Sequence, residues 1–415
     1  MSVRFRLILL ISAVVHAGLL YLVLTRQLDF LFSDASHRMG PASDFFALYN
    51  AGKHWAVGDG VYGHGPGFGF RHHPIMAMSV FAWLSALKPY TAYYVWVALT
   101  ELTLLVAAIL LRKLIADDLH FTVTIAIAVF FSPLYLEIFM GNASALAGCL
   151  LLFAYFLYVR SRSTAAFLAF VASCLIKPVG IILLPVIALK GHFKPALLAV
   201  VILIGLCVPY FIQHGADLDN LILLDATDHK STAGFLVHAG NQGLCALLMR
   251  IGAALGDTPL ASLKSVNQLP QWYAPLVYAW PVLLGGLVLW VTWLHRRSLG
   301  IEMMVFLSIS AYLLGYKDVW EHSYSILIGA LPLVYLSGKI DRRILLAGTL
   351  LLALPTGLAF YDVHIDSPGI HDPDWYWNGG TSIVHHATKP LGMLFLFASA
   401  MFKLRWNRPS STGEA

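Results

Sequence analysis

The chain has 415 residues, of which 59% are hydrophobic and 12% are charged. Soluble domains carry about 25% charged residues, so with a mean hydropathy of +0.73 the apolar residues cannot all hide in one soluble core. The net charge of +5 comes from small basic groups between apolar blocks, which indicates membrane topology rather than nucleic-acid binding.

The first apolar block, residues 7–25, predicts a membrane-spanning helix. Arg4 and Arg6 flank it and place the N-terminus in the cytoplasm. The block is longer than the apolar region of a signal peptide and lacks a small-x-small cleavage site. We therefore interpret it as a retained first span.

Asp44 opens a short amphipathic stretch, residues 41–52, directly after this span. An aspartate there favours the N-cap or the first turn of a helix. It is also a candidate general base, which would take a proton from an attacking hydroxyl, and the two roles are compatible. A carboxylate at the lipid surface beside aromatic rings such as Tyr49 suits a substrate that is part sugar and part lipid.

Basic clusters farther along predict the cytoplasmic loops and a cytoplasmic C-terminus. Spans are expected near 194–213, 272–294, 301–316, 323–337, 344–361 and 388–404. The crossings between 74 and 159 stay open, because Arg112 and Lys113 fall on the wrong side if the short block 74–87 crosses. We expect an all-α polytopic protein of about 12 transmembrane helices in one domain, residues 1–405, with a polar tail, residues 406–415.

Residues 163–190 lie between two basic clusters that should both face the cytoplasm, which one span cannot satisfy. Pro178 disfavours helix at Lys177, so the stretch is expected to divide there. A hairpin of two short helices would place Lys177 at its outer tip. Lys177 is then either a lysine snorkelling to the interface or a ligand for a phosphate.

The outer loops bring further polar groups to the same membrane face, and each has a structural alternative. Arg71 and His72 are interfacial anchors or partners of a phosphate; Arg250 forms a structural ion pair or binds the donor. Trp320 and His322 belong to the aromatic belt or contact a sugar phosphate. The remaining candidate substrate contacts are Tyr49, Tyr62, Asn142, Gln242 and Glu321.

No metal or cofactor is expected. His72 and His73 are adjacent and would not share a helix face. The acidic loop 362–377 lacks the EF-hand spacing and is interpreted as a solvated loop that could stack sugars. The cysteines, Cys149, Cys174, Cys207 and Cys245, lie in apolar surroundings without a CxxC pair.

Several runs, taken in order over about 300 residues, resemble glycosyltransferase family 87, the polyprenyl-phosphate-mannose-dependent α-mannosyltransferases of the glycosyltransferase-C superfamily. They are Ser43-Asp44-Phe45-Phe46 through Tyr62, Phe70-Arg71-His72-His73-Pro74, Gly141-Asn142-Ala143-Ser144, Ile176-Lys177-Pro178, Asn241-Gln242-Gly243-Leu244 with Arg250, and Trp320-Glu321-His322-Ser323. The chain departs from the family pattern at Asn142, where Gln is commoner, at His72-His73, where Tyr-Pro is usual, and at Ser323, where a second His is usual.

The resemblance implies a glycosyltransferase-C-like bundle with an amphipathic helix in its first outer loop. It implies inverting transfer of a sugar, with mannose in an α linkage as the expected one, from a polyprenyl-phosphate donor to a lipid or glycan acceptor on the outer face of the inner membrane. Asp44 would be the base, and Lys177, Arg71 and His322 would offset charge on the leaving phosphate. The alternatives are a lipid or solute transporter, or a scaffold subunit with a degenerate site.

Overall fold

The computed structural model describes residues 2–28, 41–62, 70, 72–177, 179–217, 241–258, 266–316, 319–355 and 379–406. These residues form helices and connecting turns, and their only bridge of strand type pairs Asn241 with Trp320. The all-α class predicted from the sequence is confirmed. Arg71 and the acidic loop 362–377 lie outside the described residues.

Four helices are long and apolar enough to cross a membrane: α1 (Val3–Leu24), α5 (Pro89–Leu114), α11 (Phe193–Gln213) and α15 (Ala274–Leu294). A fifth crossing arises if α6 (Asp118–Val129) and α7 (Ser132–Met140), which meet at an angle of 48°, count as one broken span. By length and composition the described residues therefore support a membrane protein, and about 12 spans remains a prediction.

The other helices are shorter or mixed in polarity. They are α2 (Ser43–Ala56), α3 (Pro74–Met76), η2 (Ala77–Phe81), α4 (Ala82–Leu84), α8 (Ser144–Val159), α9 (Ser163–Ile176), α10 (Gly180–Leu189), η3 (Gly215–Asp217), α14 (Leu244–Leu255), η5 (Val266–Gln268), α16 (Ile301–Gly315), η6 (Glu321–Ile326), α17 (Leu327–Ser337), α18 (Arg342–Ala353) and α19 (Gly379–Trp406).

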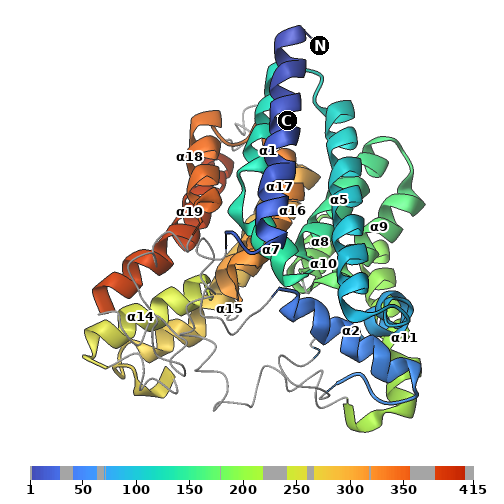
Figure 1. Cartoon of the computed structure of the whole chain (residues 1–415). Helices are drawn as coiled ribbons and strands as arrows, with labels where there is room; N and C mark the ends of the chain where they lie inside the picture. The colour runs from blue at the N-terminus through green and yellow to red at the C-terminus, as the bar shows by residue number, and fades with distance from the viewer. Residues whose placement is uncertain are drawn as a thin grey trace.

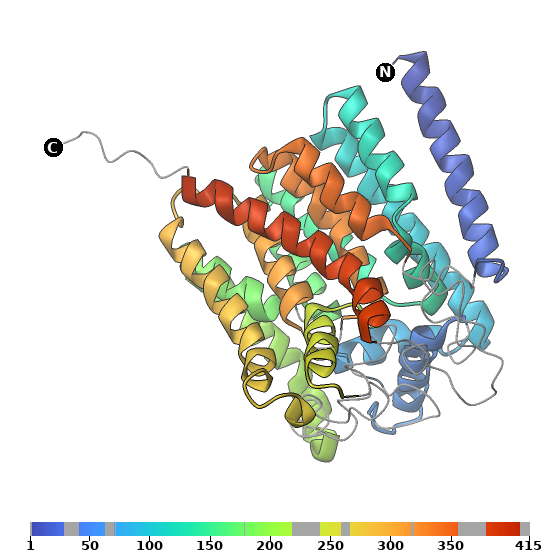
Figure 2. The same ribbon diagram turned by 90° about the vertical axis from the view of Figure 1, so that its left-hand side faces the viewer.

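The shorter helices α7 and α16 form the centre of the bundle, and the long spans stand around them (Figures 1 and 2). Every residue of α7 is buried, as is every residue of α16 from Met303 to Gly315. By contrast, α1, α11 and α15 leave most of their apolar side chains exposed. A helix that is apolar on all sides and lies at the surface fits contact with lipid.

Close approach of α8 and α17 brings η6 into the centre. A side chain at Gly329 would collide with the backbone of Gly148, and one at Gly148 would collide with the backbone of Ile326. Small residues at helix crossings let backbones approach in this way. The two glycines therefore set the distance between α8 and the segment that carries His322.

Helix α2 lies across one end of the bundle, below the upright α5 and α7 (Figure 1). Phe45 packs its ring against Phe81 and Tyr93, and Gly52 lies directly on the backbone of Phe81. The block 74–84, whose crossing the sequence left open, is thus a short helical segment packed on α2. This makes α5 the next span-length helix after α1 along the described chain.

The predicted hairpin over residues 163–190 is confirmed. Lys190, at the end of α10, donates to the carbonyl of Leu299, close in sequence to Glu302, which accepts from Tyr155 near the end of α8. Since α9 begins directly after α8, both ends of the stretch lie at the same end of the bundle, and the chain reverses between α9 and α10. Lys177 occupies the turn between the two helices, where its backbone is extended.

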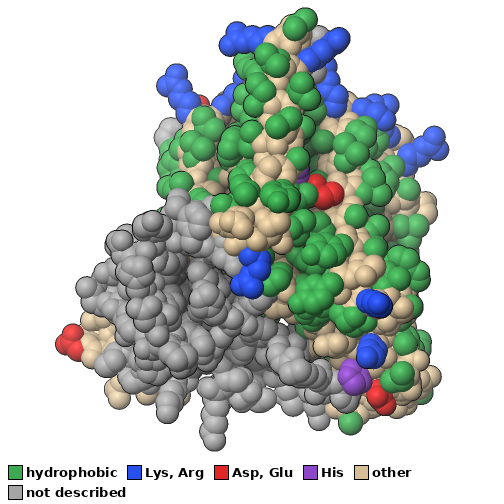
Figure 3. Space-filling model, in the orientation of Figure 1, with side chains coloured by type: hydrophobic (Ala, Val, Ile, Leu, Met, Phe, Trp, Pro, Cys, Tyr) green, Lys and Arg blue, Asp and Glu red, His purple; other side chains and the backbone are tan. Residues whose placement is uncertain are grey.

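Basic side chains gather at the end of the bundle where the N-terminus lies, opposite α2 (Figure 3). Arg112 and Lys113 close α5, and Arg342 and Arg343 open α18. The distribution separates a basic end of the bundle from an end that carries Asp44.

Candidate active site

Asp44 lies in the first turn of α2, where the positive end of the helix dipole favours a carboxylate. It is not the N-cap: that position is Ala42, whose backbone is left-handed (φ 68°) and whose amide donates to the carbonyl of Phe139 at 2.7 Å. The start of α2 is therefore fixed against α7, which holds Asp44 at the centre of the bundle end.

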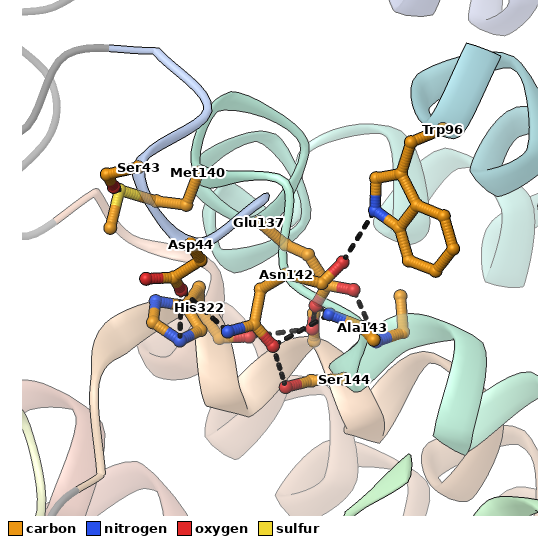
Figure 4. A network of polar contacts seen from close by, with 11 residues as sticks. Ser43, Asp44, Trp96, Glu137, Met140, Asn142, Ala143, Ser144 and His322 are labelled. Atoms are coloured by element: carbon orange, nitrogen blue, oxygen red, sulfur yellow. Dashed lines mark hydrogen bonds and ion pairs between the residues drawn. The ribbon is translucent and has the colours of Figure 1, made fainter. Parts of the chain in front are cut away.

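Three chain segments meet at the Asp44 carboxylate (Figure 4). Asn142, in the turn between α7 and α8, donates from Nδ2 to Oδ2 at 2.6 Å. His322, in η6, has its Nε2 3.5 Å from the same oxygen. Among the described residues both contacts fall on Oδ2, so Oδ1 has room for a hydrogen bond from a ligand.

The pKa of Asp44 is raised above its usual value. Burial is the largest cause; the hydrogen bond from Asn142 and the charge of Lys177 oppose it. A more basic carboxylate is a better proton acceptor at neutral pH, while the two opposing groups keep an ionised population accessible. The surroundings of Asp44 thus fit a base more closely than a merely structural carboxylate.

Asn142 is oriented by its own neighbours. Its Oδ1 accepts from the amide of Ala143 at 2.7 Å and from the hydroxyl of Ser144 at 3.2 Å. The indole of Trp96 donates to its backbone carbonyl at 3.2 Å. With the oxygen occupied in this way, the side-chain amide must present its NH₂ to Asp44.

Glu137 is a buried carboxylate of α7 that the sequence analysis missed. Both of its oxygens accept from the amide of Ala145, at 2.7 and 2.9 Å, and one also bonds the hydroxyl of Ser325. It therefore connects α7 with the start of α8 and with η6. An acidic residue inside an apolar block was the available signal, because such residues usually mark function.

His322 is almost fully buried, and its Nδ1 has no hydrogen-bond partner within the described part of the chain. Burial is the main cause that lowers its pKa well below the usual value, followed by the charges of Lys177 and His72. The lowered pKa favours the neutral ring, and the expected role of His322 in offsetting charge on the leaving phosphate stays a prediction. The ring can donate or accept one hydrogen bond to a ligand.

Lys177 and His72 complete the cluster. Lys177 is buried at the hairpin tip, and its charge alters the pKa of Asp44, His72 and His322. Burial and this charge lower the pKa of His72 to about 3, against a backbone hydrogen bond with Ile176. Lys177 is therefore the cationic member that the structure places beside Asp44.

The two tyrosines among the predicted contacts hold the backbone around the site. The hydroxyl of Tyr49 donates to the carbonyl of Leu87 at 2.8 Å and so attaches α2 to the end of the 74–84 segment. The hydroxyl of Tyr62 donates to the carbonyl of His72 at 2.9 Å. Their contact with substrate stays a prediction.

Of the remaining predicted residues, Glu321, Gln242 and Arg250 are buried and Trp320 is half-buried. Glu321 pairs with Lys389 of α19 at 3.2 Å and accepts from Ser132 at 2.9 Å. Trp320 stacks on the His322 ring at a centroid distance of 6.4 Å. Gln242 and Arg250 are wholly buried, and Figure 1 shows α14, which carries Arg250, at the other side of the bundle end from α2. A role for these four in binding substrate stays a prediction.

The arrangement places one basic carboxylate, one amide donor, one neutral imidazole and one ammonium group around a single location. Such a set can deprotonate a hydroxyl and stabilise an anionic leaving group on its other side.

A sequence model of glycosyltransferase family 87 matches residues 72–315 of this chain. No curated protein and no solved structure matches this chain. The match contains His72, Asn142, Lys177, Gln242 and Arg250 but ends before His322 and begins after Asp44.

Proposed function

Since this chain belongs to glycosyltransferase family 87, we propose that it transfers a sugar from a polyprenyl-phosphate donor to a hydroxyl of a lipid or glycan acceptor, with Asp44 as base. The observation that carries the proposal is the convergence of Asp44, Asn142 and His322 beside Lys177. These side chains come from distant parts of the sequence. Together they supply a base, hydrogen-bond donors and a cation, which are the groups that glycosyl transfer needs.

In the proposed reaction, Asp44 Oδ1 takes the proton of the acceptor hydroxyl as its oxygen attacks the anomeric carbon. The bond from that carbon to the phosphate oxygen breaks, and the electron pair leaves with the lipid phosphate. A single displacement of this kind inverts the anomeric configuration, from β in the donor to α in the product. No second carboxylate is required as a nucleophile.

Lys177 supports the departure of the phosphate. An ammonium group in a poorly hydrated site stabilises charge that develops on the leaving oxygen. The neutral His322 ring adds a hydrogen bond through Nδ1, which has no hydrogen-bond partner among the described residues. His72 lies near enough to Lys177 for their charges to interact and would contact the same phosphate. Arg71, which adjoins it in the sequence, would add a second cation.

The distribution of basic residues supports an active site that faces outward. Basic residues favour the cytoplasmic end of membrane proteins, and most of those visible in Figure 3 lie at the end opposite α2. The termini would then be cytoplasmic and the site would open on the outer face of the inner membrane. Mannose as the donor sugar rests on the family resemblance.

A decisive experiment is an assay of the purified protein with a panel of synthetic polyprenyl-phosphate sugars and mass detection of the acceptor products. Asp44→Asn should abolish transfer. Asp59→Asn, an exposed aspartate on the same segment, is the matched control and should retain it. Full transfer by Asp44→Asn would exclude Asp44 as base. A transporter, the second candidate, would instead move labelled lipid across vesicles without forming product.

A further inference from the structure

A cavity of about 560 Å³ lies within the bundle in the half that carries the basic residues. It runs between α1, α5, α6, α17 and α18, from Phe131 and Leu327 to His120 and Arg342. Most of its lining is aliphatic or aromatic. Thr124 and Thr349 also line it, and the hydroxyl of each donates to the preceding turn of its own helix. His16 and Glu101, which contact each other, are the ionisable residues in its middle. A lining that is mostly apolar favours hydrocarbon.

The wall of the cavity toward the membrane is α1, whose second half is attached to α5 and α7. His16 contacts Glu101 of α5 and the hydroxyl of Tyr135 of α7, both at 2.9 Å, and Val23 packs in a cluster with Tyr135. Ala13 and Leu9, about one and two turns before His16, line the cavity. Figure 2 shows α1 at the edge of the bundle, consistent with a cavity that opens to lipid.

The other end of the cavity is cationic. Arg342 lines it, donates to Nε2 of His120 at 2.9 Å and lies over the Tyr335 ring. Because Nε2 accepts this bond, the proton of the His120 ring is on Nδ1, which faces Asp117 at 3.1 Å. Asp117 and His120 thus orient Arg342. The hydrogen bond of Arg342 to His120 uses one of the five N–H donors of the Arg342 guanidinium. Lys339 and Arg343 add positive charge nearby, against Asp117 and Asp341.

We propose that this cavity binds an anionic phospholipid of the basic-end leaflet, with an acyl chain between α1 and α17 and its phosphate on Arg342. A basic group at the surface end of an apolar groove between transmembrane helices matches the two parts of such a lipid. The location of the basic group also argues against the isoprenoid chain of a sugar donor as the occupant. The phosphate of a donor would have to lie at the opposite end of the bundle, which carries Asp44 and Lys177. The proposal is independent of the transferase reaction.

The test uses the full-length protein, delipidated in detergent and mixed with dioleoyl phosphatidylglycerol, dioleoyl phosphatidylcholine or a polyprenyl phosphate. Native mass spectrometry counts the retained lipid. Phosphatidylglycerol should bind at one saturable site, and Arg342→Gln should weaken it about fivefold, the effect of one basic residue near an anionic lipid. Arg343→Gln, the adjacent arginine that does not line the cavity, is the matched control. Ala128→Phe, which fills the cavity, should remove the site for every lipid.

Equal retention of phosphatidylcholine and phosphatidylglycerol by the unchanged protein would overturn the proposal. So would equal loss in the Arg342 and Arg343 variants. Competition of a polyprenyl phosphate for the site blocked by Ala128→Phe would assign the cavity to the donor chain instead. Because Arg342 is exposed, its variant should fold, and this keeps the lipid preference measurable if Ala128→Phe proves unstable.

Discussion

Replacing Asn142 by Leu should shift the pH dependence of sugar transfer toward higher pH. Asn142 donates the 2.6 Å hydrogen bond that stabilises the ionised form of Asp44 against burial. A hydrogen bond to a charged group contributes about 1.5–3 kcal/mol, and 1.36 kcal/mol corresponds to one pH unit of titration. The Asp44 side chain is only 20% exposed, so solvent screens little of this energy.

Loss of the donor should therefore move the acid limb of kcat/KM upward by about 1 to 2 pH units. The sign follows from the raised pKa of Asp44: the base is inactive while protonated, and removing a group that favours its ionisation extends that range. The assay is transfer from a polyprenyl-phosphate sugar between pH 5 and 9.

Two variants make this interpretation specific. Ser144→Ala removes a hydrogen bond to the Asn142 oxygen but leaves the donor to Asp44, and should keep the profile. Asn142→Gln retains the donor and should resemble the unchanged protein. An acid limb at the same pH in Asn142→Leu, with transfer merely reduced at all pH values, would refute the idea that Asn142 controls the ionisation of the base.

Three further outcomes are expected. Asp44→Asn should lower kcat by about 10²–10⁴-fold without lowering the thermal midpoint at pH 8. Because burial raises the pKa of Asp44, ionisation of this carboxyl costs folding stability as the pH rises through that pKa. A clear loss of the thermal midpoint in the variant would contradict this reasoning. Lys389→Met should cost about 3–5 kcal/mol by removing the ammonium group that compensates the buried charge of Glu321, with recovery in Glu321→Leu/Lys389→Met measured by thermal unfolding. Gly329→Ala should destabilise by about 1–3 kcal/mol and reduce transfer, whereas Gly286→Ala, which meets nothing within 4 Å, should do neither.

Local chemistry in the sequence predicted a good part of this structure. The helical class, the hairpin around Lys177 and the proximity of Asp44, Asn142, Lys177 and His322 follow from apolar block length, from Pro178 and from the clustering of polar groups in the outer loops. Each of these signals lies within a few residues of the feature it predicts.

Long-range partnerships were not predictable in this way. Lys389 in an apolar helix resembles a lysine that snorkels to the interface, and nothing nearby in the sequence indicates its pair, Glu321. Glu137 was likewise missed, because its partners Ala145 and Ser325 become neighbours only when α8 and η6 pack together. The path of residues 74–84 depends on packing against α2, which hydropathy alone does not encode.

The assembly of the candidate site from α2, the α7–α8 turn and η6 has a consequence for biosynthesis. Asp44 leaves the ribosome early, but its imidazole neighbour follows only after most of the helices have entered the translocon. A nascent or prematurely terminated chain that lacks η6 therefore contains Asp44 without the neighbouring His322. Such a fragment should be inert toward the cell's pool of activated sugars until membrane insertion is nearly complete.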